Sequence, residues 1–141
     1  MKSIEERVAE IKDKHTRGYN CAQIVLCSYA EELGIDEETL FRISEGFGAG
    51  MGGMTETCGA ISGAVAIMGF VMSDGMENPK TKGQTYKLSR EIAKRFGEKN
   101  TTTACGTLKG IGSDKGPLRS CPGCIDDAVE IACDVLKQLA E

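Results

Sequence analysis

Apolar residues recur at a helical spacing of three to four positions along most of the chain. In the first segment, Ser3 and Glu6 have the spacing of a capping box, and Gly18 is expected to end the helix. A second stripe predicts a helix from about Asn20 to Glu32, closed by Gly34. No segment alternates between apolar and polar residues with a period of two, so the pattern predicts helices and no strands.

The second half of the sequence follows the same pattern. The longest apolar block, Gly59 to Met72, predicts a buried central helix that starts near Thr55 to Thr57, just after a glycine-rich loop. A helix with Gly97 as its stop follows a polar loop, and the last helix is expected to begin near Pro122. With the short helix expected in "DEETLFRISEG", the chain is predicted to be an all-α, single-domain bundle of about five helices over residues 1–141.

Composition and charge exclude some classes of function. The 17 basic and 21 acidic residues give a formal charge of −4, and the basic ones are spread thinly, so no nucleic-acid surface is expected. The apolar block is shorter than the roughly 20 residues that a membrane span needs. The charged N-terminus has no signal-peptide core, so the sequence predicts a cytoplasmic protein that binds neither membrane nor nucleic acid.

Cysteine is the residue type that carries chemistry here. Reduced thiols are expected in the cytoplasm, and an odd number argues against a closed disulfide framework, so metal binding or redox chemistry is favoured. The seven cysteines are Cys21, Cys27, Cys58, Cys105, Cys121, Cys124 and Cys133.

Several of these cysteines fall at predicted helix starts. Cys21 and Cys58 lie in the first turns of their helices, and Cys121 and Cys124 flank the start of the last one, while Cys105 lies in a loop near an expected helical turn. Unpaired N–H groups and the helix dipole favour the thiolate at such positions. The thiolate is the form that binds metals and attacks disulfides.

Two glycines and two cysteines have alternative explanations. Gly59 and Gly63, four residues apart, either let several thiolates pack around a cofactor or only allow close helix packing, and the sequence leaves both open. Cys27 is six residues from Cys21, on a different helix face, and Cys133 lies on an apolar stripe. Both are therefore predicted to be core residues.

The order of motifs resembles the C_GCAxxG_C_C family, which is described as redox-active. The resemblance rests on "GYNCAQ" (18–23), on the glycine loop followed by "CGAISG" (58–63), and on the later cysteines. It implies a small helical protein with a redox or metal role and four characteristic cysteines. By position these are Cys21, Cys58, Cys105 and either Cys121 or Cys124.

The resemblance extends to a cysteine-bearing region of split-Soret cytochromes, where such cysteines are associated with an iron–sulfur centre. The heme part has no counterpart here, because Ile125 and not histidine follows "CPGC". An iron–sulfur cluster held by these cysteines, for electron transfer or redox sensing with a redox partner protein, is the leading hypothesis. A homodimer is compatible with it.

Three alternatives stay open. Cys121 and Cys124 form a C-x-x-C pair suited to metal-free thiol–disulfide chemistry, four thiolates could hold a structural zinc, and the cysteines could simply pack a helical interaction module. His15, the only histidine, is expected at the surface, so no acid–base pair is evident and a carrier or sensor is favoured over an enzyme. The G-x-G-x-x-G match at 48–53 follows no strand and does not predict nucleotide binding.

Overall fold

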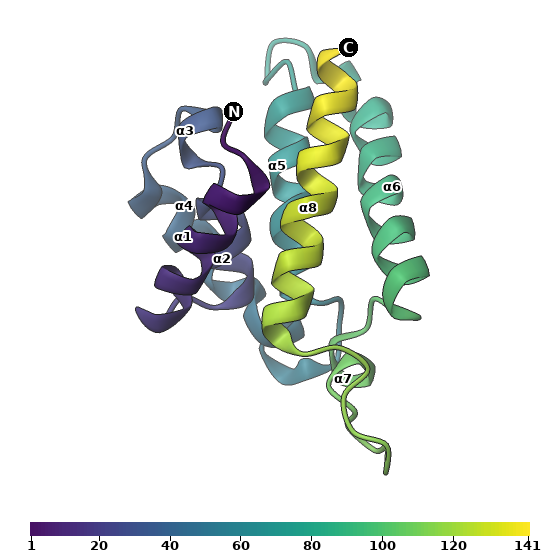
Figure 1. Ribbon diagram of the computed structural model, residues 1–141. Coiled ribbons are helices and arrows are strands. Elements are labelled where there is room, and N and C mark those ends of the chain that lie inside the picture. The colour runs from purple at the N-terminus through teal and green to yellow at the C-terminus, as the bar shows by residue number, and fades with distance from the viewer.

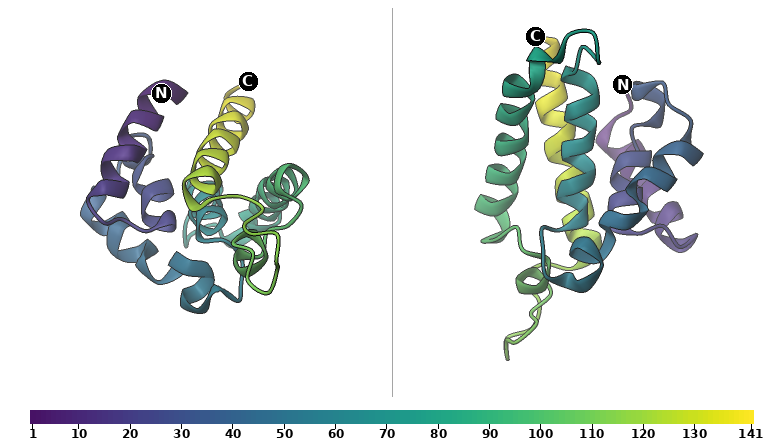
Figure 2. Two further views of the ribbon diagram at one scale, coloured as in Figure 1. Left: turned by 60° about the horizontal axis from the view of Figure 1, so that its bottom comes forward. Right: turned by 180° about the vertical axis from the view of Figure 1, so that it is seen from behind.

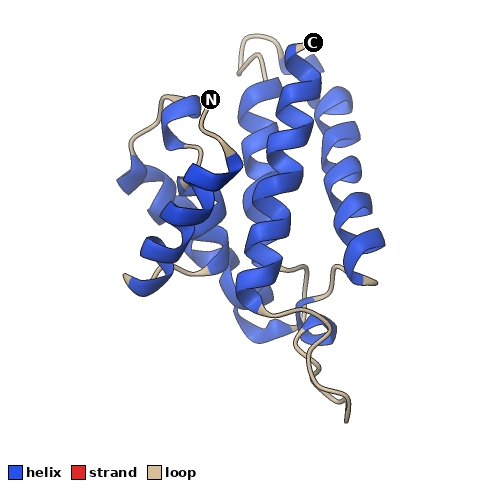
Figure 3. Cartoon of the chain, viewed as in Figure 1, coloured by secondary structure: helices blue, strands red, loops and turns tan.

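The chain is all-α, as the sequence predicts, and the computed structural model describes all 141 residues (Figure 3). It has eight α-helices where about five were expected: each of the six helical segments described above is present, one of them is split in two, and one connecting loop contains a further short helix. The helices are α1 (Ile4–Thr16), α2 (Cys21–Cys27), α3 (Ala30–Leu33), α4 (Glu37–Ser44), α5 (Gly59–Met72), α6 (Lys82–Asn100), α7 (Cys105–Leu108) and α8 (Cys121–Ala140), with short turns η1 (Glu45–Phe47), η2 (Gly50–Met54) and η3 (Pro79–Thr81).

The three longest helices of the second half form one group. Helices α5, α6 and α8 lie side by side and contact one another, and α1 to α4 pack against one side of this group (Figures 1 and 2). Helices α5 and α8 begin at the same end of the molecule, where α7 also lies (Figure 1). None of the helices combines the length and apolar character that crossing a membrane requires.

The central helix α5 is in close contact with α2 because it carries glycine on the shared face. A methyl group added at Gly63 would lie 2.9 Å from the carbonyl oxygen of Ala22 and 3.1 Å from Cβ of Val25. One turn earlier, a methyl group at Gly59 would lie 2.6 Å from Sγ of Cys21. Both glycines therefore allow the two helices to approach more closely than alanine would.

The helix predicted from Asn20 to Glu32 is interrupted. Helix α2 ends at Cys27, and α3 starts at Ala30. The interruption has a polar cause: the Ser28 hydroxyl donates to the carbonyl oxygen of Ile24 at 2.6 Å, and the buried Arg7 guanidinium donates to the carbonyl oxygen of Ser28. Since Arg7 binds that carbonyl from α1, the chain turns at this point instead of continuing as a helix.

Two other predicted boundaries are wrong. The central helix starts at Gly59, with Cys58 as its cap, and not near Thr55 to Thr57. Helix α6 continues past Gly97 to Asn100, whose side chain donates to Oδ2 of the buried Asp127 at 3.1 Å. This tertiary contact stabilises the extra helical turn by more than the low helix propensity of Gly97 destabilises it.

The reciprocal capping box expected at Ser3 and Glu6 is found instead at the start of α2. Ser3 accepts from the backbone N–H of Glu6 at 3.1 Å, but Glu6 does not bind back to the backbone of Ser3. The reciprocal pair occurs at α2, where Asn20 Oδ1 accepts from the Gln23 N–H at 2.9 Å and Gln23 Oε1 accepts from the Asn20 N–H at 2.8 Å. The box thus fixes the start of the helix that carries Cys21.

Replacing Gly63 by alanine is expected to destabilise the protein by about 1–3 kcal/mol, because α2 and α5 must separate to accommodate the methyl group. Gly69→Ala is the matched control on the same helix, since nothing lies within 4 Å of its added methyl group. It should be neutral or stabilising by up to about 1 kcal/mol. Urea unfolding of both variants measures the difference, and equal stabilities would contradict the close-packing role of Gly63.

Candidate functional site

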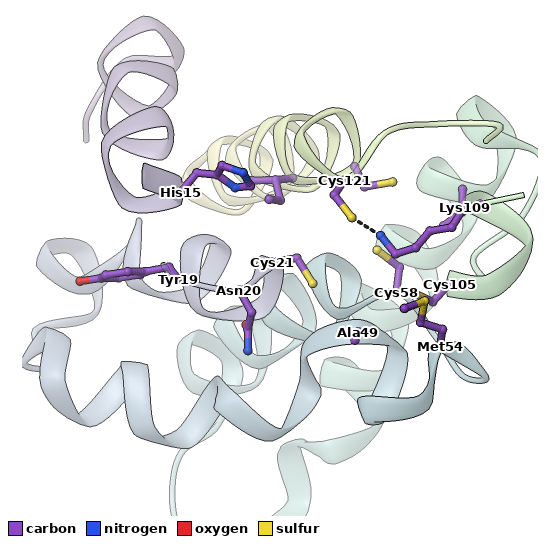
Figure 4. Close-up of a pocket in the computed structure, with 13 residues that line it drawn as sticks. His15, Tyr19, Asn20, Cys21, Ala49, Met54, Cys58, Cys105, Lys109 and Cys121 are labelled. Carbon is purple, nitrogen blue, oxygen red and sulfur yellow. Dashed lines mark hydrogen bonds between the residues drawn. The ribbon is translucent and has the colours of Figure 1, made fainter. Parts of the chain in front are cut away.

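Five of the seven cysteines surround one cavity of about 300 Å³ at the end of the molecule where α5 and α8 begin (Figure 4). The sulfur atoms of Cys21, Cys58 and Cys121 point toward a common space in this view. Most of the remaining lining is apolar, with Ile125 and Leu108 among the contributors. The cavity cysteines are Cys21, Cys58, Cys105, Cys121 and Cys124, the set that the sequence predicted.

Helix starts supply all five thiols. Cys21 is the first residue of α2, Cys58 is the cap of α5, and Cys105 is the first residue of α7. Cys121 and Cys124 lie three residues apart at the start of α8, hence on one face. Four helices that are far apart in the sequence thus place thiols around one cavity.

Backbone hydrogen bonds link the segments that carry Cys58 and Cys105. The backbone N–H of Cys58 donates to the carbonyl oxygen of Thr103 at 2.9 Å. The backbone N–H of Cys105 donates to the carbonyl oxygen of Glu56, also at 2.9 Å. These two bonds hold the start of α5 against the start of α7. A methyl group at Gly50 would overlap Cβ of Cys105, so the glycine loop must pass this point without a side chain.

The glycine loop forms one wall of the cavity in an unusual backbone conformation. Residues 49 to 52 all have positive φ, including Ala49 at 53° and Met51 at 64°, and Met54 has a φ of 58°. A left-handed conformation costs a non-glycine residue about 1–2 kcal/mol. Ala49 and Met54 both line the cavity, and the backbone N–H of Ala49 donates to the sulfur of Cys21. The strained segment therefore contributes directly to the site.

A buried ionic network positions the start of α8. The Asp127 carboxylate, 1% exposed, accepts from Arg119 Nε at 3.0 Å and pairs with Lys99 Nζ at 2.7 Å. Burial alone would raise the pKa of Asp127, but these hydrogen bonds and one from Asn100 lower it overall. Because Arg119 is the residue before Ser120, the N-cap of α8, the network fixes the turn that presents Cys121 and Cys124.

Cys58 and Cys124 form a hydrogen-bonded pair within the cavity. The Cys124 thiol donates to the sulfur of Cys58, and this bond, aided by the N–H groups of α5, lowers the pKa of Cys58 although burial opposes it. The same bond, followed by burial, raises the pKa of Cys124. The pair therefore holds a proton more tightly on Cys124 than on Cys58, which favours the thiolate at Cys58.

The predicted preference for thiolate at helix starts holds for Cys58 and fails for two others. Burial is the largest influence on Cys21 and Cys105, and it raises the pKa of both thiols. The N–H of Ala49 acts in the opposite direction on Cys21 without reversing the shift. Taking all these thiols to the thiolate form therefore requires a positive charge in the cavity.

Lys109 is the cavity residue that the sequence analysis missed. Its ammonium group donates to the sulfur of Cys121 (Figure 4). Burial lowers the pKa of Lys109, but the hydrogen bond and the nearby thiol charges raise it more, so the amine stays protonated. The available signal was spacing: Lys109 lies four residues after Cys105, one helical turn away, which places it on the same face.

The other candidate residues lie in three kinds of place. Gly59 and Gly63 are not part of the cavity lining, and what the structure shows of them is close packing, so a role at a cofactor stays a prediction. Cys27 and Cys133 are buried in the core away from the cavity. His15 is exposed, as expected, but it also lines the rim of the cavity.

The thiols surround the cavity without converging on a single point. No three histidine, cysteine, aspartate or glutamate side chains lie close enough together, as they stand, to hold one metal ion. The sulfur atoms are instead distributed over a volume many times the roughly 30 Å³ that a water molecule takes in the liquid.

Comparison with known proteins gives one match. A family model described as "Putative redox-active protein (C_GCAxxG_C_C)" matches residues 19–135, which include all five cavity cysteines. This confirms the resemblance found in the sequence. No curated protein and no solved structure matches the chain.

In the reduced, metal-free protein, iodoacetamide is expected to modify Cys58 efficiently at neutral pH, because its pKa lies below that of an ordinary thiol. Cys124→Ala removes the hydrogen-bond donor, so the pKa of Cys58 rises and its alkylation at pH 7 slows. Cys124→Ser keeps a donor and should retain most of the rate, and Cys133→Ser serves as the control. Peptide mapping by mass spectrometry measures the rate, and an unchanged rate in Cys124→Ala would contradict the assigned pair.

Proposed function

Because the chain belongs to the C_GCAxxG_C_C family of redox-active proteins, we propose that its cavity holds an iron–sulfur cluster and that the protein carries electrons or senses redox state. The observation that carries the proposal is the convergence of five thiols, from four helix starts, on one cavity of about 300 Å³. Iron–sulfur clusters take four cysteine thiolates. Cys21, Cys58, Cys105 and one of the two cysteines of α8 would supply them.

The dimensions of the cavity favour a cluster over a single zinc ion. Zinc binds four sulfur atoms at about 2.3 Å, so its ligands must lie within van der Waals contact of one another. The ligand side chains do not gather that closely. An occupant of several atoms fits thiols that are distributed around a cavity of this volume.

The surroundings of the thiols suit a charged, redox-active group. Such a cluster, when bound, takes up and releases single electrons. The Lys109 ammonium and the N–H groups at the helix starts offset the negative charge of four thiolates. Ala49, Leu108 and Ile125 give the sulfur atoms apolar neighbours, and the polarity around a metal group is one of the ways a protein sets a reduction potential.

The lining also favours a carrier or sensor over a catalyst. No carboxylate lines the cavity, and its one histidine, His15, lies exposed at the rim. Proton transfer between defined groups therefore has little support, whereas electron transfer needs only a bound redox group and a partner protein that exchanges electrons with it.

A second candidate function is favoured by the contact between Cys58 and Cys124. A thiolate beside a protonated thiol is the arrangement of a disulfide-exchange pair. In this case Cys58 would attack a partner disulfide and Cys124 would then close the Cys58–Cys124 disulfide, releasing the partner as two thiols. The pair differs from the C-x-x-C pair that the sequence suggested, since Cys121 binds Lys109 instead.

Protein purified without oxygen is expected to contain iron and acid-labile sulfide and to show a visible absorption band that bleaches on reduction. Cys58→Ser should lose both elements, because Cys58 lines the cavity and is one of the family-type cysteines. Cys27→Ser, a change in the core away from the cavity, should keep them.

Equal loss of iron in both variants would contradict the assignment of the site. Zinc in place of iron and sulfide would make the site structural. A metal-free protein in which a Cys58–Cys124 disulfide forms and is reduced at a defined potential would replace the cluster by the second candidate.

A further inference from the structure

The cavity has one more thiol than an iron–sulfur cluster requires. Four thiolates complete the ligand set, and five cysteines line the cavity. If the proposed function is right, one cysteine is therefore a free thiol beside the bound group. The environments of the five sulfur atoms indicate which one.

Cys121 differs from the other four in what its sulfur contacts. It is the one cavity cysteine whose sulfur is bound by a charged side chain, the ammonium of Lys109. Cys124, Cys58 and Cys105 are buried, with 3–6% of their surface exposed. Cys21 is half-buried like Cys121, but its sulfur accepts from the backbone N–H of Ala49 and packs beside Gly59.

The choice between the two cysteines of α8 follows from this difference. Cys124 is buried and hydrogen-bonded to Cys58, so it already lies beside a family-type cysteine in the interior of the cavity. Cys121 lies one turn earlier, at the first position of the helix, and its side chain is partly accessible. Cys124 is therefore the better fourth ligand.

The cavity also offers a path from solvent to Cys121. Its lining continues past the thiols to Tyr19 and Asn20, which are half-buried, and to His15, which is exposed. His15 and Cys121 lie on the same side of the cavity in Figure 4. A small molecule can thus enter at the rim and meet the sulfur of Cys121.

We propose that Cys121 is not a cluster ligand but a free thiol that exchanges with small disulfides, and that Lys109 is its positioning residue. In this step the Cys121 thiolate attacks one sulfur of a disulfide, a new sulfur–sulfur bond forms, and the other half of the disulfide leaves as a thiolate. No further oxidant or reductant is needed, because the disulfide supplies both the new bond and the leaving group. A lysine ammonium beside the sulfur is a typical environment of a reactive cysteine.

The test uses the protein purified without oxygen, with 2-hydroxyethyl disulfide as a small, uncharged probe. Iron and sulfide are measured in wild type, Cys121→Ser and Cys124→Ser, and adducts are located by intact mass and peptide mapping. We expect one adduct in wild type, at Cys121, without loss of iron. Cys121→Ser should keep its iron and take no adduct, whereas Cys124→Ser should lose most of its iron.

The Lys109→Met variant tests whether Cys121 reacts because Lys109 positions its sulfur or only because that sulfur is accessible to the probe. It should slow adduct formation at Cys121 by about three- to tenfold, because the Lys109 ammonium no longer holds the attacking sulfur in place by its hydrogen bond. Lys109→Arg should restore most of the rate. Lys115→Met, a change in the exposed loop between α7 and α8, is the matched control and should leave the rate unchanged.

Loss of iron in Cys121→Ser together with retention in Cys124→Ser would overturn the assignment. If wild type contains no iron and sulfide, the proposed function fails, but the inference about Cys121 is still decided. A Cys121 adduct whose rate depends on Lys109 would then support the reactive thiol, and a Cys121 that takes no adduct would overturn it.

Discussion

The close approach of α2 and α5 is the constraint on which the site depends. Gly63 lets the backbone of α5 reach the carbonyl oxygen of Ala22, and Gly59 leaves room for the sulfur of Cys21 beside the first turn of α5. A larger residue at either position would separate the helices and move Cys21 away from Cys58. The close packing of these two helices therefore determines the spacing of two thiols that belong to different parts of the sequence.

Around these thiols, burial and charge act in opposite directions. The apolar lining raises the pKa of Cys21 and Cys105, so an isolated thiolate at either position is disfavoured. Lys109, the helix starts and the Cys124 thiol each favour negative charge on a neighbouring sulfur. Such a balance suits a site whose thiolates share their charge with a bound metal group. Without such a group, Cys58 is the cavity cysteine whose lowered pKa favours the thiolate.

The sequence predicted the fold class, because helical periodicity is local. Helix-start signals and the family resemblance together named as candidate ligands the five cysteines that line the cavity, and left open which cysteine of α8 is the fourth. It could not predict which interactions outweigh local propensity. Arg7 ends α2 early from another helix, and Asp127 extends α6 beyond Gly97, and both effects need side chains far apart in the sequence. Lys109 was missed for a related reason, since its importance depends on Cys121, which only the fold brings near.

The distribution of the thiols along the chain has a consequence for how the protein is made. Cys21, Cys58 and Cys105 precede the start of α8, and the ionic network of Asp127 that sets the turn into this helix requires residues up to 127. A nascent chain therefore exposes incomplete sets of thiols throughout most of its synthesis. Under the proposed function, loading of the cluster would be a late event in biogenesis, and the thiols would need protection from oxidation until then.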